Sequence, residues 1–175
     1  MIMNNFEYAF ETIEIPDDDF AALLEKNRTD VYFVAAATVI ALCNYGKNPE
    51  KCFRMLGFLK NPAEPVSVYE KQFLRDRLGG KEYKPFSYLK GSEPSNSYTP
   101  NEPYVVRVMS NPELSFIDDG WARIFLHSSG ADFDREMKLR RKRSTGGWYL
   151  VEQMLLSDIR EPLSEGGSSP ADVWG

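Results

Sequence analysis

The sequence predicts an α+β fold in which N-terminal helices pack on one face of a C-terminal antiparallel sheet. In the first half, apolar residues recur at helical spacing, whereas in the second half they alternate with polar residues. Proline, serine, asparagine and tyrosine dominate the stretch between the two halves. With 175 residues, 42% of them hydrophobic and 27% charged, the chain suits a globular protein.

We expect a single domain over residues 1–162, because typical domains run to roughly 100–150 residues. Its helical half should span about 17–80, a long loop 84–103 and the antiparallel sheet 104–156. The last residues, 163–175, are rich in glycine, serine and acidic side chains, which predicts a flexible tail.

The first half contains three helix-start signals. Pro16–Asp19 places carboxylates where the first turn of a helix has free N–H groups. Asn48–Pro49 has the order of a cap followed by a first helical residue. Ser67 and Glu70 have the spacing of a capping box, and Gly79–Gly80 ends that helix.

One further helix, at about 30–44, is apolar nearly all round. A helix with this pattern is buried on most sides, so we expect it to form the centre of the core. It carries Cys43, and the next helix carries Cys52; both thiols are interpreted as buried core fillers.

The second half has strand periodicity in four segments. Tyr104–Met109 is rich in valine, while Trp121–His127 and Arg135–Lys142 alternate apolar and polar residues. Ser144–Gly147 supplies a turn before the partner strand Trp148–Leu156. Strands of this one-sided kind indicate an antiparallel sheet with one dry face.

Composition narrows the classes of function. A net charge of −5 argues against a dedicated nucleic-acid binder, so no nucleic-acid partner is expected. Two cysteines without a CxxC pair favour reduced thiols in the cytoplasm. No secretory signal is visible at the N-terminus, and the longest apolar run is too short for a membrane helix.

The sequence predicts no metal and no cofactor. Cys43, Cys52 and His127 are the soft ligand candidates, and a zinc site needs more. Glycine-rich phosphate loops and dinucleotide-binding fingerprints are missing from the sequence. A catalytic alternative rests on His127, Asp132 and Arg123, where a histidine at a strand end lies near a carboxylate; the simpler interpretation of that loop is a hairpin turn.

Arg140–Arg143 is the most conspicuous charged run. It could bind phosphate or an acidic partner, but consecutive strand residues point to opposite faces, which argues against one continuous patch. The segment from 104 to 162 holds nine basic and nine acidic residues, so the cluster is local. We favour a solvated strand face over a phosphate site on these grounds.

Several aromatic residues lie in or beside the loop 84–103. This loop is either a functional site or a structural crossover between the helices and the sheet. Its aromatic side chains could line a groove with Trp121 and Arg123, or they could pin the loop to the sheet; they are Tyr83, Phe86, Tyr88, Tyr98 and Tyr104.

One resemblance covers most of the chain, from about residue 30 to 162. It rests on short segments spread over the second half, namely Phe86–Gly91, Asn96–Pro100, Pro103–Tyr104, Ser128–Asp132, Leu139–Arg140, Trp148 and Leu155–Arg160. In these segments the chain resembles an uncharacterised bacterial domain family of unknown function. The resemblance implies a bacterial origin and one compact module, and it supplies no site residues.

The leading functional hypothesis is a cytoplasmic, non-enzymatic binding or interaction module whose partner is a protein or a small ligand. Its surface would comprise the loop 84–104 and one exposed sheet face, with Tyr88, Tyr98, Trp121, Arg123 and Phe125 as binding residues. The alternative is a small-molecule hydrolase or isomerase with a pocket between helices and sheet, in which His127, Asp132 and Arg123 converge.

Overall fold

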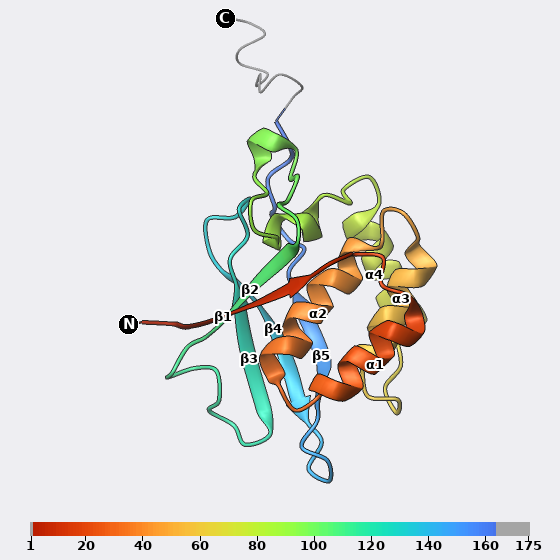
Figure 1. Ribbon diagram of the computed structural model, residues 1–175, viewed down its shortest axis with the longest axis vertical. Coiled ribbons are helices and arrows are strands. Elements are labelled where there is room, and N and C mark those ends of the chain that lie inside the picture. The colour runs from red at the N-terminus through yellow and green to blue at the C-terminus, as the bar shows by residue number, and fades with distance from the viewer. Residues whose placement is uncertain (1, 164–175) are drawn as a thin grey trace, which may run out of the picture.

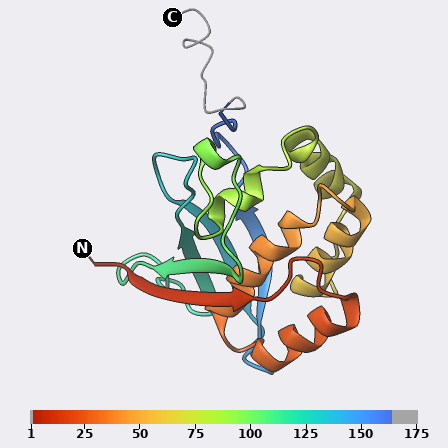
Figure 2. The ribbon, with the colours of Figure 1, turned by 45° about the horizontal axis from the view of Figure 1, so that its top comes forward.

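The computed structural model describes residues 2–163 and confirms the α+β fold (Figure 1). Its helices lie on one face of a five-stranded sheet, and Figure 2 shows α2 between the sheet and the other helices. The helices are α1 (Asp17–Asn27), α2 (Val31–Cys43), α3 (Pro49–Leu59) and α4 (Val68–Leu78). The strands are β1 (Asn4–Phe10), β2 (Tyr104–Ser110), β3 (Trp121–Leu126), β4 (Arg135–Arg141) and β5 (Trp148–Met154).

The sheet follows chain order, β1-β2-β3-β4-β5, and every neighbouring pair is antiparallel. Its face toward the helices is dry, as the alternation predicts: in β3, Ala122, Ile124 and Leu126 are fully buried. Opposite them in β4 lie Met137 and Leu139, which are also fully buried. Because the strand order begins with β1 and ends with β5, these two strands form the edges of the sheet.

Strand β1 precedes the helices, so the expectation of helices first and strands afterwards is wrong at the N-terminus. It pairs with β2 over its whole length, from Asn4 opposite Ser110 to Phe10 opposite Tyr104. A period-two signal is present, because the aromatic residues Phe6, Tyr8 and Phe10 alternate with Glu7 and Ala9. The aromatic side chains pack on α2, where the rings of Phe6 and Tyr32 stack at 3.9 Å.

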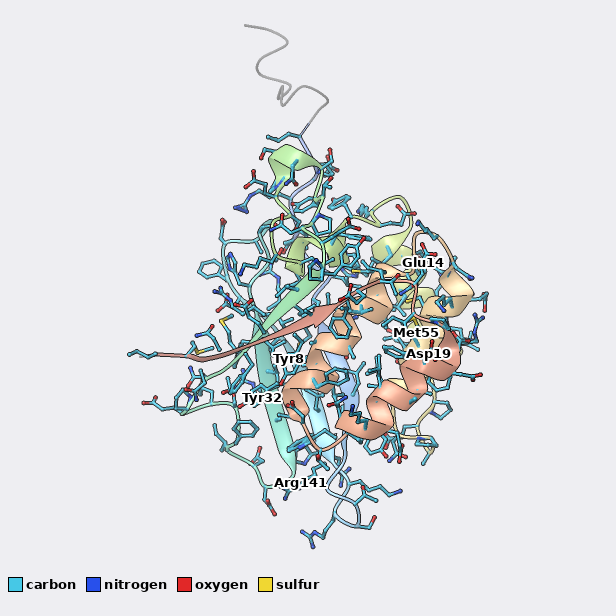
Figure 3. The ribbon with its side chains drawn as sticks, viewed as in Figure 1. Tyr8, Glu14, Asp19, Tyr32, Met55 and Arg141 are labelled. Atoms are coloured by element: carbon cyan, nitrogen blue, oxygen red, sulfur yellow. The ribbon has the colours of Figure 1, made fainter. Side chains whose placement is uncertain are left out.

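Helix α2 is the centre of the core, as its composition predicts. Every residue of it except Tyr32 is buried, and it contacts all five strands. Its N-terminus is capped by Asp30, whose Oδ1 accepts hydrogen bonds from the backbone N–H groups of Tyr32 and Phe33 at 3.0 and 3.3 Å. Figure 3 shows Tyr8 and Tyr32 close to this end of the helix.

The predicted start signals mark α1, α3 and α4, but two carboxylates act differently from the expectation. Asp17 lies in the first turn of α1 and pairs with Arg54 and Lys51 of α3 at 2.7 and 3.1 Å, which lowers its pKa. Glu70 does not complete a capping box: Ser67 accepts its N–H, while its carboxylate binds Lys60 at 2.9 Å. Lys60 is almost fully buried, and a buried ammonium group without a counter-charge is costly. The Glu70 carboxylate therefore pairs with Lys60 instead of capping the helix.

Cys43 and Cys52 are free and buried, as core fillers should be. Burial raises the pKa of both thiols, that of Cys52 to about 12. Since the thiolate is the reactive form, we expect neither cysteine to react with a thiol reagent such as dithionitrobenzoate in the folded protein. Both should react after unfolding in concentrated guanidinium chloride; labelling of the native protein at the unfolded rate would contradict this packing.

The segment 84–103 is an ordered crossover with two short 3₁₀ helices, η1 (Lys84–Tyr88) and η2 (Pro94–Asn96). Its side chains hold the segment that follows β5: Lys84 Nζ donates to Leu156 O, and Tyr88 Oη donates to Leu155 O. Tyr98 Oη donates to Arg160 O at 2.6 Å. The expected tail 163–175 lies outside the described residues apart from Leu163.

Candidate functional site

The outer face of the sheet, away from the helices, carries aromatic and charged side chains in cross-strand rows. Register places Trp121, Arg140 and Tyr149 opposite one another on β3, β4 and β5. Residues directly opposite in an antiparallel pair have adjacent side chains. The guanidinium of Arg140 accordingly lies over the Trp121 ring, 4.9 Å from its centroid.

On a second part of the outer face, Arg123 of β3 and Glu136 of β4 form an ion pair. Arg123 Nε and Nη2 donate to the two carboxylate oxygens of Glu136 at 2.7 and 3.0 Å, which raises the pKa of Arg123. The same guanidinium lies 5.6 Å from the centroid of the Phe125 ring. This bidentate pair leaves Arg123 less available to a ligand than Arg140.

A hollow of about 410 Å³ opens at the end of the sheet where β4 turns into β5. We call it the basic hollow, and its lining includes Trp121, Tyr149 and four consecutive cations, Arg140, Arg141, Lys142 and Arg143. Figure 3 shows Arg141 at this end of the sheet. The carboxylates of Glu64 and Asp119 also belong to the lining, which leaves an excess of positive charge.

The four cations share one hollow although strand alternation argues against a continuous patch. Strand β4 ends at Arg141, and Lys142 already belongs to the turn, where its N–H donates to Gly147 O at 2.7 Å. Arg140 extends over Trp121 on one side, and Arg141 lies 5.7 Å from the Trp148 ring centroid on the other. The hollow wraps around the strand end, so alternation does not separate them.

Most of the positive charge in the basic hollow has no carboxylate partner among residues 2–163. Arg141 pairs with Asp119 at 3.2 Å. Arg140, Lys142 and Arg143 form no ion pair with any residue in 2–163. All four residues are exposed to solvent, so an incoming anion can reach them.

Trp121 separates the basic hollow from a smaller one of about 330 Å³. The connection between β2 and β3 forms part of that lining through Leu114 and Ile117, which are 40% and 66% exposed. The sequence contains a signal for this hollow in the apolar residues of the connection, although they form no recognisable motif. Trp121 is therefore half-buried between the basic hollow and a hollow lined by both apolar and charged side chains.

Comparison with known proteins gives one match. The model of the family described as "Domain of unknown function (DUF6935)" matches residues 16–163. The chain belongs to this family. No curated protein and no solved structure matches it.

Among the binding residues expected in this DUF6935 domain, the structure separates two groups. Trp121, Arg123 and Phe125 lie on the outer face, each partly exposed. Tyr88 and Tyr98 are 5% and 2% exposed and hold the crossover in place, so their assignment as binding residues stays a prediction. Their aromatic composition resembles that of a binding loop, but their hydroxyl groups donate to buried backbone carbonyls.

Within residues 2–163 of the DUF6935 domain, no hydrogen bond or ion pair joins the three candidate catalytic residues to one another. His127 Nδ1 lies 3.4 Å from Asp134 Oδ1, Asp132 pairs with Arg160 at 2.8 Å, and Arg123 pairs with Glu136. Each therefore has a different partner. Among residues 2–163 there is also no cluster of three or more His, Cys, Asp or Glu side chains that could hold a metal.

The α-helices of the DUF6935 domain within residues 2–163 are 11 to 13 residues long. Within the described part of the chain, none is both long and apolar enough to cross a bilayer. The longest, α2, has 13 residues and is enclosed by the sheet and the other helices.

Proposed function

We propose that this domain is a non-enzymatic binding module, and that the basic hollow takes up an acidic peptide segment of a partner protein. One observation carries the proposal: Arg140, Lys142 and Arg143 line one hollow with Trp121 and have no carboxylate partner among the described residues. Carboxylates of a partner would supply the missing counter-charges, and Trp121 would add apolar contact area.

An acidic peptide is favoured over a nucleic acid by the charge distribution. The whole chain has a net charge of −5, and the segment from 104 to 162 is balanced between acids and bases. A nucleic acid extending beyond the hollow would meet an acidic surface and be repelled. Glu64 and Asp119 within the lining would also repel the closely spaced phosphates of a nucleic acid. A short peptide would be repelled less, because it can place its carboxylates next to the free cations.

The catalytic alternative has less support, because a general acid–base mechanism needs its groups within hydrogen-bond reach of one reacting atom. Arg123 and Asp132 belong to two separate ion pairs, and His127 lies beside a third group, Asp134. Their assignment as a site stays a prediction. A bacterial origin, a cytoplasmic location and a single domain ending at residue 162 are further parts of the proposal that the structure leaves as predictions.

The test is a titration of a fluorescein-labelled hexa-aspartate peptide, followed by fluorescence anisotropy. The doubly substituted variant R140E/R143E should bind at least about tenfold more weakly than the wild type, because two attractive charges become repulsive. The control K26E/K81E makes the same change in net charge at two exposed lysines outside the hollow and should bind like the wild type. Binding should also weaken between about 50 and 300 mM salt.

Three results would contradict the proposal. The first is no saturable binding by the wild type at low salt. The second is an equal loss of affinity in R140E/R143E and in K26E/K81E, which would indicate a non-specific effect of net charge. The third is tighter binding of a single-stranded RNA oligonucleotide of equal charge, which would make the hollow a nucleic-acid site.

A further inference from the structure

A groove of about 530 Å³ separates α4 from the edge strand β5. We call it the β5 groove; Tyr69 and Phe73 form its wall on α4, and Val151–Met154 line its opposite side. Four consecutive strand residues cannot all present side chains to one hollow on a face of the sheet, since neighbouring side chains point to opposite faces. The β5 groove therefore runs along the edge of the strand.

The backbone along this edge has free hydrogen-bonding capacity. At its start the edge of β5 is already occupied: Trp148 N donates to Arg28 O at 2.8 Å, and Leu150 pairs with Lys60 in an isolated bridge. Over Val151–Met154, no backbone hydrogen bond leads to described residues outside the sheet. The outward N–H and C=O groups can thus pair with another strand.

The wall on α4 presents two accessible aromatic side chains, and the guanidinium of Arg77 lies 4.9 Å from the centroid of the Phe73 ring. Tyr69 and Phe73 are four positions apart and so lie on one helix face, and they are 82% and 38% exposed. Met154 on the strand side is 37% exposed. At the base, Lys60 Nζ is held by both oxygens of Glu70 at 2.9 and 3.0 Å, so the charge there is already neutralised. Side chains of an added strand would find apolar contacts here.

The β5 groove is continuous with the basic hollow. Leu150 and Val151 line both, so the two depressions follow the same strand from Tyr149 to Met154. A strand paired antiparallel to β5 would begin beside Met154 and end beside Val151, where the free edge stops, and its C-terminal residues would continue toward the basic hollow. Its C-terminal end would then lie at the cations Arg140–Arg143.

We infer that the β5 groove receives an extended peptide as an additional antiparallel strand, whose acidic C-terminal end enters the basic hollow. The part of this inference that concerns the acidic end rests on the proposed function. The part that concerns strand pairing rests on the free edge of β5 and the aromatic side chains of α4. All the strand pairs in the sheet are antiparallel, and antiparallel pairing is slightly more stable per residue than parallel pairing. Backbone pairing supplies affinity, and the charged end selects the partner and the direction.

The probe is a synthetic dodecapeptide with alternating valine and threonine followed by four C-terminal aspartates. Hydrogen exchange of the wild-type protein at saturating peptide should slow at least about tenfold at the β5 amides within Val151–Met154. Amides on the other edge strand, within Asn5–Ala9, are the internal control and should exchange as in the free protein. A peptide with N-methyl groups at alternate backbone nitrogens should bind at least about tenfold more weakly, because it cannot complete the ladder.

Variants on α4 test the aromatic side chains of the wall. Y69A/F73A should weaken binding of the dodecapeptide by about tenfold or more. V68A is the matched control, since Val68 is 81% exposed on the same helix and does not line the groove. Both variants alter exposed side chains, so circular dichroism should show unchanged folds.

The outcomes separate this inference from the proposed function. If the peptide protects the β5 amides from exchange but binds R140E/R143E as tightly as the wild type, the strand site stands and the placement of the acidic end in the basic hollow is wrong. Charge-dependent binding without protection of β5, or with equal affinity for the N-methylated peptide, would overturn the strand site and keep the proposed function. No saturable binding of the dodecapeptide, a preference for N-terminal aspartates, or protection of β5 by self-association without peptide would also overturn the inference.

Discussion

Replacing Gly130 by alanine is expected to lower the free energy of unfolding by about 2–3 kcal/mol. A Cβ atom at this position would overlap Tyr98 Oη and would lie 2.9 Å from Ile159 Cγ2. Neither neighbour can move freely, because Tyr98 donates to Arg160 O and Gly130 O accepts from Arg160 N at 2.9 Å. The substitution should therefore loosen the crossover and the segment after β5 together, as measured by urea denaturation.

Two comparisons isolate the cause. In the background Y98F, which lacks the overlapping oxygen, G130A should cost about 1 kcal/mol less than in the wild type. G57A adds a Cβ with nothing within 4 Å in helix α3 and should stabilise by roughly 0.5–1 kcal/mol. Equal costs of G130A in both backgrounds would show that the contact with Tyr98 is not the reason.

Asp30→Ala is expected to destabilise the protein by about 2–3 kcal/mol, since one carboxylate makes two kinds of contact. Its Oδ1 caps the buried helix α2, and its Oδ2 accepts a 2.6 Å hydrogen bond from Tyr8 of β1. Burial and this bond raise the pKa of Tyr8, so the phenol stays protonated and donates at neutral pH. Thermal and urea denaturation both measure the loss.

A double-mutant cycle separates the cap from the strand contact. Tyr8→Phe alone should cost about 1 kcal/mol, and in its background Asp30→Ala should cost less by a similar amount. Asp30→Asn should retain most of the cap, because asparagine accepts the same N–H bonds. Strict additivity of Tyr8→Phe and Asp30→Ala would contradict an energetic link between β1 and α2.

The fold class and most element boundaries could be predicted because local signals agree with tertiary packing. Asp30 and Ser67 start helices where their side chains can cap them, and β3 alternates because one of its faces is dry. Strand β1 was missed although Phe6 and Tyr8 carry the same alternation. Its signal is short and lies before the helices, and only pairing with β2 makes it a strand.

The candidate site was only partly predictable, because it depends on contacts between distant segments. Tyr88 and Tyr98 have the composition of binding residues, yet their hydroxyl groups find carbonyls about sixty residues away that no local pattern shows. The basic hollow depends on where β4 ends relative to its cations. Sequence periodicity places Arg140 and Arg141 on opposite faces, but it does not show that both faces meet at the end of a strand.

The β5 groove was beyond sequence analysis for a related reason. Which strand lies at an edge follows from sheet order, and the 82% exposure of Tyr69 follows from how α4 packs in the folded chain. Sequence shows an aromatic pair at helical spacing, and such a pair is more often part of the core. The open side of α4 becomes visible when the whole sheet is assembled.

The most direct measurement of the central claim is a ¹H–¹⁵N NMR titration of the wild-type protein with the dodecapeptide that ends in four aspartates. We predict that the amides of Arg140–Arg143 and the indole N–H of Trp121 show the largest chemical-shift changes, and that the amides of Val151–Met154 show the next largest. Shifts confined to the His127–Asp134 loop, or none at Arg140–Arg143 when the peptide is in excess, would contradict a binding module that uses the basic hollow.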